Sequence, residues 1–284
     1  MWLAAGAILL VLLVLAWRIR TEEGEAVAQG HVVHVSPPEE VTTPPTPRDS
    51  TIPAPEQLRV RVLRRLPHDP EAFTQGLEVH PDGRVFESTG LNGRSSLREV
   101  VLDSGVVTRR REVDAQYFAE GLTIVDDRLI QLTWQDGVAF EYDLATFEPR
   151  RQLAYTGEGW GLAWDGARLV MSDGSSALVF RDPDTFAELG RVTVTTGGVE
   201  LERLNELECA GGLVWANVWL TDFIARIDPA SGAVVDWLDL TGLLTREQEL
   251  EADVLNGIAI DPVSGRVFVT GKDWPSVFEI QVAD

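Results

Sequence analysis

Short apolar runs separated by Gly, Asn and Asp turns recur along most of this chain, and they fall into five similar phrases. Each phrase opens with a Gly- or Asn-marked turn, passes through two apolar strands joined by a tight turn, and ends in polar or aromatic residues. The residues that precede the first Leu or Ile of the phrases are Gly76, Gly121, Gly161, Glu206 and Gly257, at intervals of 45, 40, 45 and 51. Periods of about 40–50 residues with four short strands each are typical of β-propellers.

The repeat therefore predicts an all-β fold, a five-bladed β-propeller. The fifth phrase ends near Val282 without room for an outermost strand, whereas residues 58–63 form a spare strand before the first phrase. We expect this N-terminal strand to pair with the last blade, which closes the ring and removes an exposed strand edge. Segments of the form Asp-x-x-(Ser/Thr)-(Gly/Phe) predict hairpin turns between outer strands and not catalytic aspartates. Helix is expected only over residues 245–252.

Residues 1–20 differ from the repeats. An uninterrupted apolar run of sixteen residues, 2–17, is followed by Arg18 and Arg20. As a helix this run would span about 24 Å, slightly less than a bilayer core of about 30 Å. We interpret residues 1–20 as an N-terminal membrane anchor or an uncleaved, signal-like helix, because the basic residues follow the apolar run. Their position conflicts with the positive-inside rule for an exported domain, so the topology stays open. We expect an exported, membrane-anchored protein on the periplasmic or extracellular face.

Residues 21–56 predict a disordered tether. Seven of the fifteen prolines fall there, with six glutamates, and the apolar surface is too small to offset the entropy lost on ordering. Residues 57–284 then form the predicted propeller domain, which we expect to be a monomer.

The formal net charge of the chain is −21. A nucleic-acid surface is excluded on this basis, because phosphate binding needs a basic patch. High negative charge chiefly serves solubility, and it also permits attraction of a cationic substrate such as a free amino terminus.

Equivalent positions of every blade face the mouth of the central channel, so the residues that differ at the ends of the repeated strands are candidates to converge. These residues are Gln75, Glu120, Trp134, Trp160, Asn205, Trp219 and Lys272.

The sequence motifs within these repeats are specific enough to indicate a protein family. The motifs are Pro67-His-Asp-Pro-Glu-Ala-Phe-Thr-Gln-Gly-Leu77, Ser95-Ser-Leu-Arg98, Phe118-Ala-Glu-Gly-Leu122, Gln131-Leu-Thr-Trp134, Gly157-Glu-Gly-Trp-Gly-Leu162, Leu204-Asn-Glu-Leu-Glu208, Asn217-Val-Trp219, Leu255-Asn-Gly257 and Thr270-Gly-Lys272. From about Val60 to its end, the chain resembles the plant and bacterial type of glutaminyl-peptide cyclotransferase, the glutamine cyclotransferase family. The family's fold is a five-bladed propeller, in agreement with the count from the repeats.

The resemblance implies conversion of an N-terminal glutaminyl residue of peptides or proteins to pyroglutamyl, with release of ammonia. Glu120 matches the family's acid/base glutamate, and its apolar neighbours are expected to raise its pKa. Lys272 and Asn205 match the positions that polarise the amide and hold the oxyanion. Gln75 would receive the α-amine or backbone of the substrate. The walls of the pocket would come from Phe73, Phe118, Trp134, Trp160 and Trp219.

Three other polar residues of the repeats are interpreted as structural. Glu158 is expected to form a turn, Glu206 to hydrogen-bond within the channel, and Arg98 to act as a structural cation.

Two alternatives remain at this point. The first is a non-catalytic, membrane-tethered propeller that binds peptide or protein partners. The second is a metal-dependent hydrolase or the unrelated zinc-type cyclase, which the sequence disfavours because only His68 and His80 fall within residues 57–284 and no metal-binding motif occurs there. We expect no cofactor and no metal in catalysis, while the resemblance allows a structural calcium in the channel.

Overall fold

The structure is a computed structural model, and it describes residues 54–283. The predicted anchor, and the predicted tether except for its last three residues, lie outside that range. The one helix within the range is α1 (Arg246–Glu249), which begins after the N-cap Thr245 inside the expected segment. Between residues 54 and 283, no helix is long and apolar enough to cross a membrane.

Twenty strands form five units of four strands each. The first unit is β2 (Thr74–Val79), β3 (Val85–Thr89), β4 (Ser96–Val101) and β5 (Val106–Glu112), and the second is β6 (Ala119–Val125), β7 (Arg128–Thr133), β8 (Val138–Asp143) and β9 (Pro149–Ala154). The third unit is β10 (Leu162–Trp164), β11 (Leu169–Met171), β12 (Ala177–Arg181) and β13 (Glu188–Thr193). The fourth is β16 (Leu204–Ala210), β17 (Leu213–Val218), β18 (Phe223–Ile227) and β19 (Val234–Asp239). The fifth is β20 (Leu255–Ile260), β21 (Val267–Gly271), β22 (Ser276–Val282) and the N-terminal β1 (Glu56–Pro67). A separate hairpin joins β14 (Thr195–Thr196) to β15 (Val199–Glu200).

The N-terminal strand β1 is the outermost strand of the fifth unit. Its residues 60–67 pair antiparallel with β22, as the spare strand predicted. Its first four residues, 56–59, also pair parallel with β19, so the fourth and fifth units share one eight-stranded sheet. This second pairing covers part of the edge of β19 as well as that of β22.

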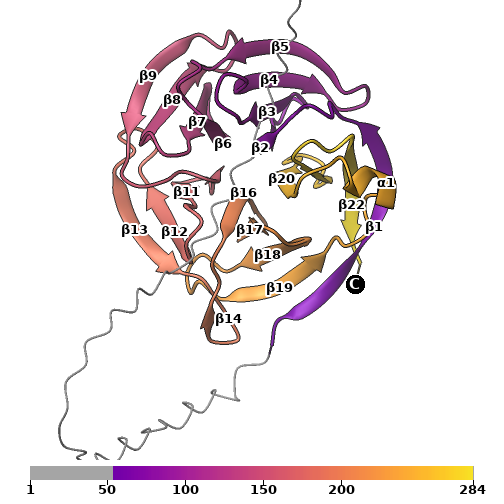
Figure 1. Ribbon diagram of the computed structural model, residues 1–284. Helices are drawn as coiled ribbons and strands as arrows, with labels where there is room; N and C mark the ends of the chain where they lie inside the picture. Colours follow the sequence, from indigo (N-terminus) through magenta and orange to yellow (C-terminus); the bar gives the residue numbers. More distant parts are fainter. Residues whose placement is uncertain (1–53, 284) are drawn as a thin grey trace, which may run out of the picture. The chain divides into compact units, whose positions relative to one another are not determined.

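Burial follows the position of a strand within its unit. All seven residues of the inner strand β6 are buried, whereas exposed and half-buried residues alternate along the outer strand β5. The inner strands contact one another in the order β2, β6, β10, β16, β20 and back to β2, and Figure 1 shows the units arranged in a ring around them. Five apolar clusters fill the spaces between consecutive units. This all-β arrangement of four-stranded sheets is consistent with a propeller.

The aspartate turns predicted at Asp143, Asp182 and Asp228 are confirmed, whereas Asp103, in the corresponding turn of the first unit, pairs with Arg64 instead. Asp143 accepts hydrogen bonds from the backbone of Ala145 and Thr146, and Asp182 and Asp228 hold their own turns in the same way. These carboxylates cap turns on the outer part of the units and take no part in the site.

Candidate functional site

Three predicted site residues, together with the neighbouring Asn256, lie at the same kind of irregularity in strand pairing. Near the start of β2, β6, β16 and β20, the pairing with the next strand shifts register, as at a β-bulge. The shift in β2 occurs at Gln75 alone, and the other three occur at Glu120, Asn205 and Asn256, each with the residue that follows. Because a bulge redirects side chains that a regular strand would place on a sheet face, the repeat directs these four residues toward the same end of the ring.

Glycine allows the inner strands to approach one another at these bulges. A Cβ atom on Gly76 would lie 2.6 Å from the backbone nitrogen of Leu122, and one on Gly121 would lie 2.7 Å from that of Leu162. Backbone therefore meets backbone across neighbouring units, which any larger residue would prevent. The glycines that mark the repeat bring the adjacent site residues together.

Glu120 is buried, and its Oε1 accepts a hydrogen bond of 2.9 Å from Nε2 of Gln75. Burial raises the pKa of Glu120 well above its ordinary value, the nearby charge of Lys272 lowers it in part, and Glu158 raises it further. A raised pKa makes the carboxyl group a better proton acceptor as well as a proton donor, which suits a group that must do both.

Lys272 lies at the same end of the ring, just after β21. Its side chain is buried, and Nζ lies 4.8 Å from the centre of the Phe73 ring. Burial lowers the pKa of the Lys272 ammonium, while the carboxylates of Glu120, Asp253 and Asp273 raise it. Glu120 and Lys272 come from the second and fifth units, yet each lies close enough to shift the pKa of the other, as their predicted convergence requires.

Five half-buried aromatic residues lie beside these polar groups. Phe73 packs edge-on against Phe118 with ring centres 6.1 Å apart, and Phe118 packs against Trp134 at 5.7 Å. Trp160 and Trp219 form a third edge-on pair at 5.6 Å. Such contacts fix ring orientation. The predicted pocket walls thus come together from four units.

Glu158 joins the two aromatic groups. Its Oε2 accepts the indole N–H of Trp134 at 2.8 Å and that of Trp160 at 2.9 Å, and Oε1 accepts from Gln135. The interpretation of Glu158 as a simple turn former was therefore incomplete, because its partners lie in other parts of the site.

Asn205 and Gln75 are both buried but differ in their partners. Among residues 54–283 the side-chain amide of Asn205 makes no hydrogen bond, which leaves its donors for another molecule. Both ends of the Gln75 amide are engaged, Nε2 with Glu120 and Oε1 with Nδ2 of Asn256. The expected contact of Gln75 with substrate stays a prediction.

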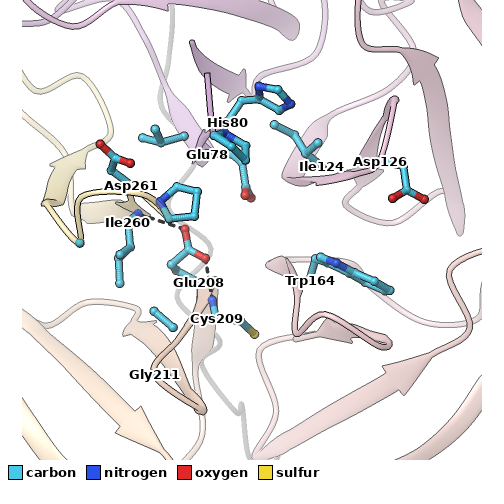
Figure 2. Close-up of a pocket in the computed structure, with 15 residues that line it drawn as sticks. Glu78, His80, Ile124, Asp126, Trp164, Glu208, Cys209, Gly211, Ile260 and Asp261 are labelled. Atoms are coloured by element: carbon cyan, nitrogen blue, oxygen red, sulfur yellow. Dashed lines mark hydrogen bonds between the residues drawn. The ribbon is translucent and has the colours of Figure 1, made fainter. Parts of the chain in front are cut away.

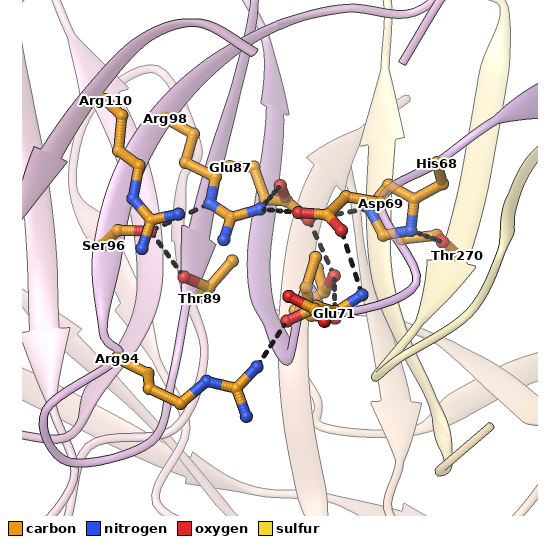
Figure 3. Close-up of polar contacts among 12 residues, drawn as sticks. His68, Asp69, Glu71, Glu87, Thr89, Arg94, Ser96, Arg98, Arg110 and Thr270 are labelled. Carbon is orange, nitrogen blue, oxygen red and sulfur yellow. Dashed lines mark hydrogen bonds and ion pairs between the residues drawn. The ribbon is translucent and has the colours of Figure 1, made fainter. Parts of the chain in front are cut away.

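A buried polar network joins His68, Glu87 and Arg98 (Figure 3), and His68 begins the loop that leads to Phe73. His68 donates from Nδ1 to the carbonyl of Trp274 at 2.7 Å and from Nε2 to Oε1 of Glu87 at 2.8 Å. Burial lowers the pKa of His68, but the Glu87 carboxylate outweighs it, so that the pKa is raised. Because both ring nitrogens face acceptors, this arrangement favours the imidazolium, with both nitrogens protonated. Arg98 lies 2.8 Å from Asp69 and 3.7 Å from Glu87, which confirms its prediction as a structural cation.

Replacing His68 by Gln is expected to destabilise the protein most at low pH. Because the folded pKa of His68 is raised above an unfolded value of about 6.5, its contribution is fully present below that value and is lost as pH rises through the folded pKa. A hydrogen bond to a charged group contributes about 1.5–3 kcal/mol. Urea unfolding of wild type and variant from about pH 5 to about pH 9 measures the difference. An equal difference at every pH would show that His68 is neutral.

A cavity of about 690 Å³ lies at the other ends of the inner strands (Figure 2). Glu78, Ile124, Trp164 and Glu208 are among its walls, and neither Glu120 nor Lys272 lines it. Burial raises the pKa of Glu208 to about 8, and its oxygens accept the backbone N–H groups of Cys209 and Ile260. The channel thus has a second polar end, away from the predicted catalytic residues.

Glu206 hydrogen-bonds within the channel as expected. Its two oxygens accept the backbone N–H groups of Leu77 and Ile258, and burial raises its pKa well above the ordinary value. The residue links the inner strands β2, β16 and β20.

Comparison with known proteins decides the family. A model of the glutamine cyclotransferase family matches residues 37–282. The chain belongs to this family. It is 43% identical over 227 residues to the glutaminyl-peptide cyclotransferase of Arabidopsis thaliana, with 78% of this chain and 71% of the relative covered. It is also similar to the crystal structure of the Myxococcus xanthus glutaminyl cyclase, with a TM-score of 0.73, 41% identity and coverage of 81% of this chain and 100% of the other. The family resemblance stated from the motifs is confirmed.

The glutamine cyclotransferase motifs contain one site position that the sequence analysis did not single out. Asn256 stands in Leu255-Asn-Gly257 and makes direct contact with Gln75. Alignment of the five phrases on Gly257 and its equivalents would have identified it, since Gln75, Glu120, Trp160 and Asn205 precede the corresponding residues.

Proposed function

We propose that this chain, a glutaminyl-peptide cyclotransferase by family, cyclises N-terminal glutaminyl residues by acid/base catalysis through Glu120. The α-amine attacks the side-chain amide carbon, a new C–N bond closes a five-membered ring, and the bond to the amide nitrogen breaks to release ammonia. The supporting observation is the buried Glu120 carboxyl, with a raised pKa, held by Gln75 and under the influence of Lys272.

Glu120 serves both halves of the reaction in this proposal. As a carboxylate it takes the proton that the attacking amine loses, and it then delivers that proton to the departing nitrogen. One group with a pKa near the working pH is suited to both transfers. Ring closure itself needs little assistance, because the amine and the amide belong to one residue.

Lys272 and Asn205 stabilise the oxygen of the tetrahedral intermediate. Lys272 presents an ammonium group, and the Asn205 amide has free donors within the described part of the chain. Donors already in place at a site of developing charge need no reorganisation during the reaction. Phe73, Phe118, Trp134, Trp160 and Trp219 would enclose the short amide side chain and exclude water.

We also infer that the five four-stranded units are the blades of a five-bladed β-propeller closed by β1. The cyclic order of inner-strand contacts and the pairing of β1 with β22 support this. In such a ring the four bulges, on β2, β6, β16 and β20, face one end of the channel, as the proposed site requires. A non-catalytic binding propeller is disfavoured, because the family match is accompanied by Glu120, Asn205 and Lys272.

A peptide assay tests the function. The full chain is incubated with a peptide that begins with Gln, and we expect a product lighter by about 17 Da, the mass of the ammonia expelled. The same peptide with an acetylated α-amine is the matched control and should not react, because its nucleophile is blocked. Equal conversion of both peptides, or of neither, would contradict the proposal.

A structural calcium is the one metal that the resemblance allows. Over residues 54–283, no group of three or more His, Cys, Asp or Glu side chains is arranged to hold a metal ion. Glu206 and Glu208 in the channel already bond backbone N–H groups with both carboxylate oxygens. The described residues thus show no carboxylate cluster of the kind that holds calcium, and no step of the reaction is assigned to a metal.

EDTA is expected to leave the cyclisation rate unchanged. The proton transfers and the oxyanion are assigned to side chains of the protein, so removal of divalent metal should not affect them. Rates before and after dialysis against chelator measure this, with near-ultraviolet circular dichroism as the check on folding. Loss of turnover in a protein that stays folded would contradict the metal-independent mechanism.

A further inference from the structure

We propose that Asn256 is a positioning residue that fixes the orientation of the Gln75 amide and thereby the hydrogen bond that Glu120 receives. This inference rests on the proposed acid/base role of Glu120. Asn256 occupies the bulge of the fifth unit, the position that Gln75, Glu120 and Asn205 occupy in theirs. It is fully buried and touches no reacting group itself.

The backbone carbonyl of Thr74 fixes the orientation of the Asn256 amide, and through it that of the Gln75 amide. Nδ2 of Asn256 donates to the carbonyl oxygen of Thr74 at 3.0 Å and to Oε1 of Gln75 at 3.0 Å. A carbonyl oxygen only accepts, so the nitrogen end of the Asn256 amide must face Thr74. With that end fixed, Gln75 must turn its oxygen to Asn256 and its nitrogen to Glu120, which it meets at 2.9 Å.

The other end of the Asn256 amide shows what the residue contributes. Its Oδ1 is buried and has no hydrogen-bond partner among the described residues. A buried acceptor without a partner is destabilising, and an apolar residue of similar size would avoid that cost. The two bonds donated by Nδ2 are therefore the interactions that account for an asparagine here.

The chain of bonds acts on the carboxyl group of Glu120. An N–H donated to a carboxylate favours its charged form, whereas a carbonyl oxygen in the same place would favour the protonated acid. The other charged or titratable groups that influence Glu120 are Lys272, Glu158 and Tyr155. None of them replaces the donor that Asn256 keeps in position.

Asn256→Leu tests this, with Asn217→Leu as the matched control. Asn217, on the neighbouring strand β17 of the fourth unit, is also a fully buried asparagine, and its Oδ1 accepts the N–H of Gly257 without contact to Gln75. We expect Asn256→Leu to move the acid limb of the kcat/KM profile upward by about one pH unit, a tenfold lower rate on that side. Asn217→Leu should leave the limb in place. One peptide is used throughout, so the titration of its amine is common to all variants.

A double-mutant cycle distinguishes positioning from general damage. In a Gln75→Ala background, Asn256→Leu should cause no further shift, because its effect passes through Gln75. A full shift in that background, or an unmoved limb in the single variant, would overturn the inference. Asn256→Ala serves the same comparison if the leucine variant does not fold.

A ¹³C NMR titration of labelled glutamate carboxyls separates the inference from the catalytic proposal. The Glu120 resonance is assigned by its loss in Glu120→Gln, and its pKa should rise in Asn256→Leu. If it rises while Glu120→Gln keeps wild-type activity, the positioning stands and the acid/base role fails. If it does not rise while Glu120→Gln is inactive, the positioning fails and the role stands.

Discussion

Glu120→Gln is expected to lower kcat/KM for a Gln-initiated peptide by about 10²–10⁴, the range for losing a general acid/base. Gln has the shape of Glu and can still accept the N–H of Gln75 through its oxygen. It cannot take the proton of the attacking amine or deliver it to the departing nitrogen. Steady-state ammonia release, measured at the pH optimum of the wild type, gives the ratio.

The stability of this variant is its control. Because burial raises the folded pKa of Glu120, the wild type loses stability as pH rises from the unfolded pKa through the folded one. A neutral Gln has no such loss, so Glu120→Gln should be at least as stable as wild type at neutral and higher pH. A drop in activity that accompanies a drop in melting temperature would point to misfolding, and wild-type turnover would refute the assignment.

Much of the fold could be predicted from local sequence signals. The spacing of Gly76, Gly121 and Gly161 predicted the units because each glycine permits the close approach of neighbouring inner strands. The missing outermost strand of the last phrase likewise predicted the pairing of β1 with β22. In both cases the signal is local, since a repeated unit must meet the next one in the same way.

Pairings between distant elements were harder to predict. The parallel contact of β1 with β19 depends on two outer edges that become neighbours only in the folded ring. The β14–β15 hairpin turns at Gly197 and Gly198, both at positive φ, a turn signal that the period of 40–50 residues conceals.

The residues of the candidate site also fall into those that local sequence predicted and those that only the folded structure brings together. Glu120, Asn205 and Lys272 were predicted from their motifs, and the structure places Glu120 and Lys272 under mutual electrostatic influence. Glu158 was not, because a glutamate between Gly157 and Gly159 has the local appearance of a turn residue. Its function as an acceptor for two indoles follows only when the second and third units are side by side.

Lys272→Met should combine a rate loss with a displaced pH profile. Loss of one oxyanion donor typically lowers the rate by about 10²–10³. The positive charge of Lys272 also lowers the pKa of Glu120, so its removal raises that pKa and moves the acid limb of the profile to higher pH. Methionine keeps the length and apolar character of the side chain against Phe73. The pH dependence of kcat/KM for wild type and variant measures both effects.

Lys272→Arg separates the charge of this residue from its position. Arginine keeps the positive charge, so the acid limb should stay near its wild-type place, whereas the larger guanidinium displaces the donor from the oxyanion and the rate should fall. If Lys272→Met instead moved the acid limb to lower pH, Lys272 would be acting on Glu120 with the opposite sign. If it kept the wild-type rate, the oxyanion would have to be held by Asn205 alone, since a thioether has no N–H to donate.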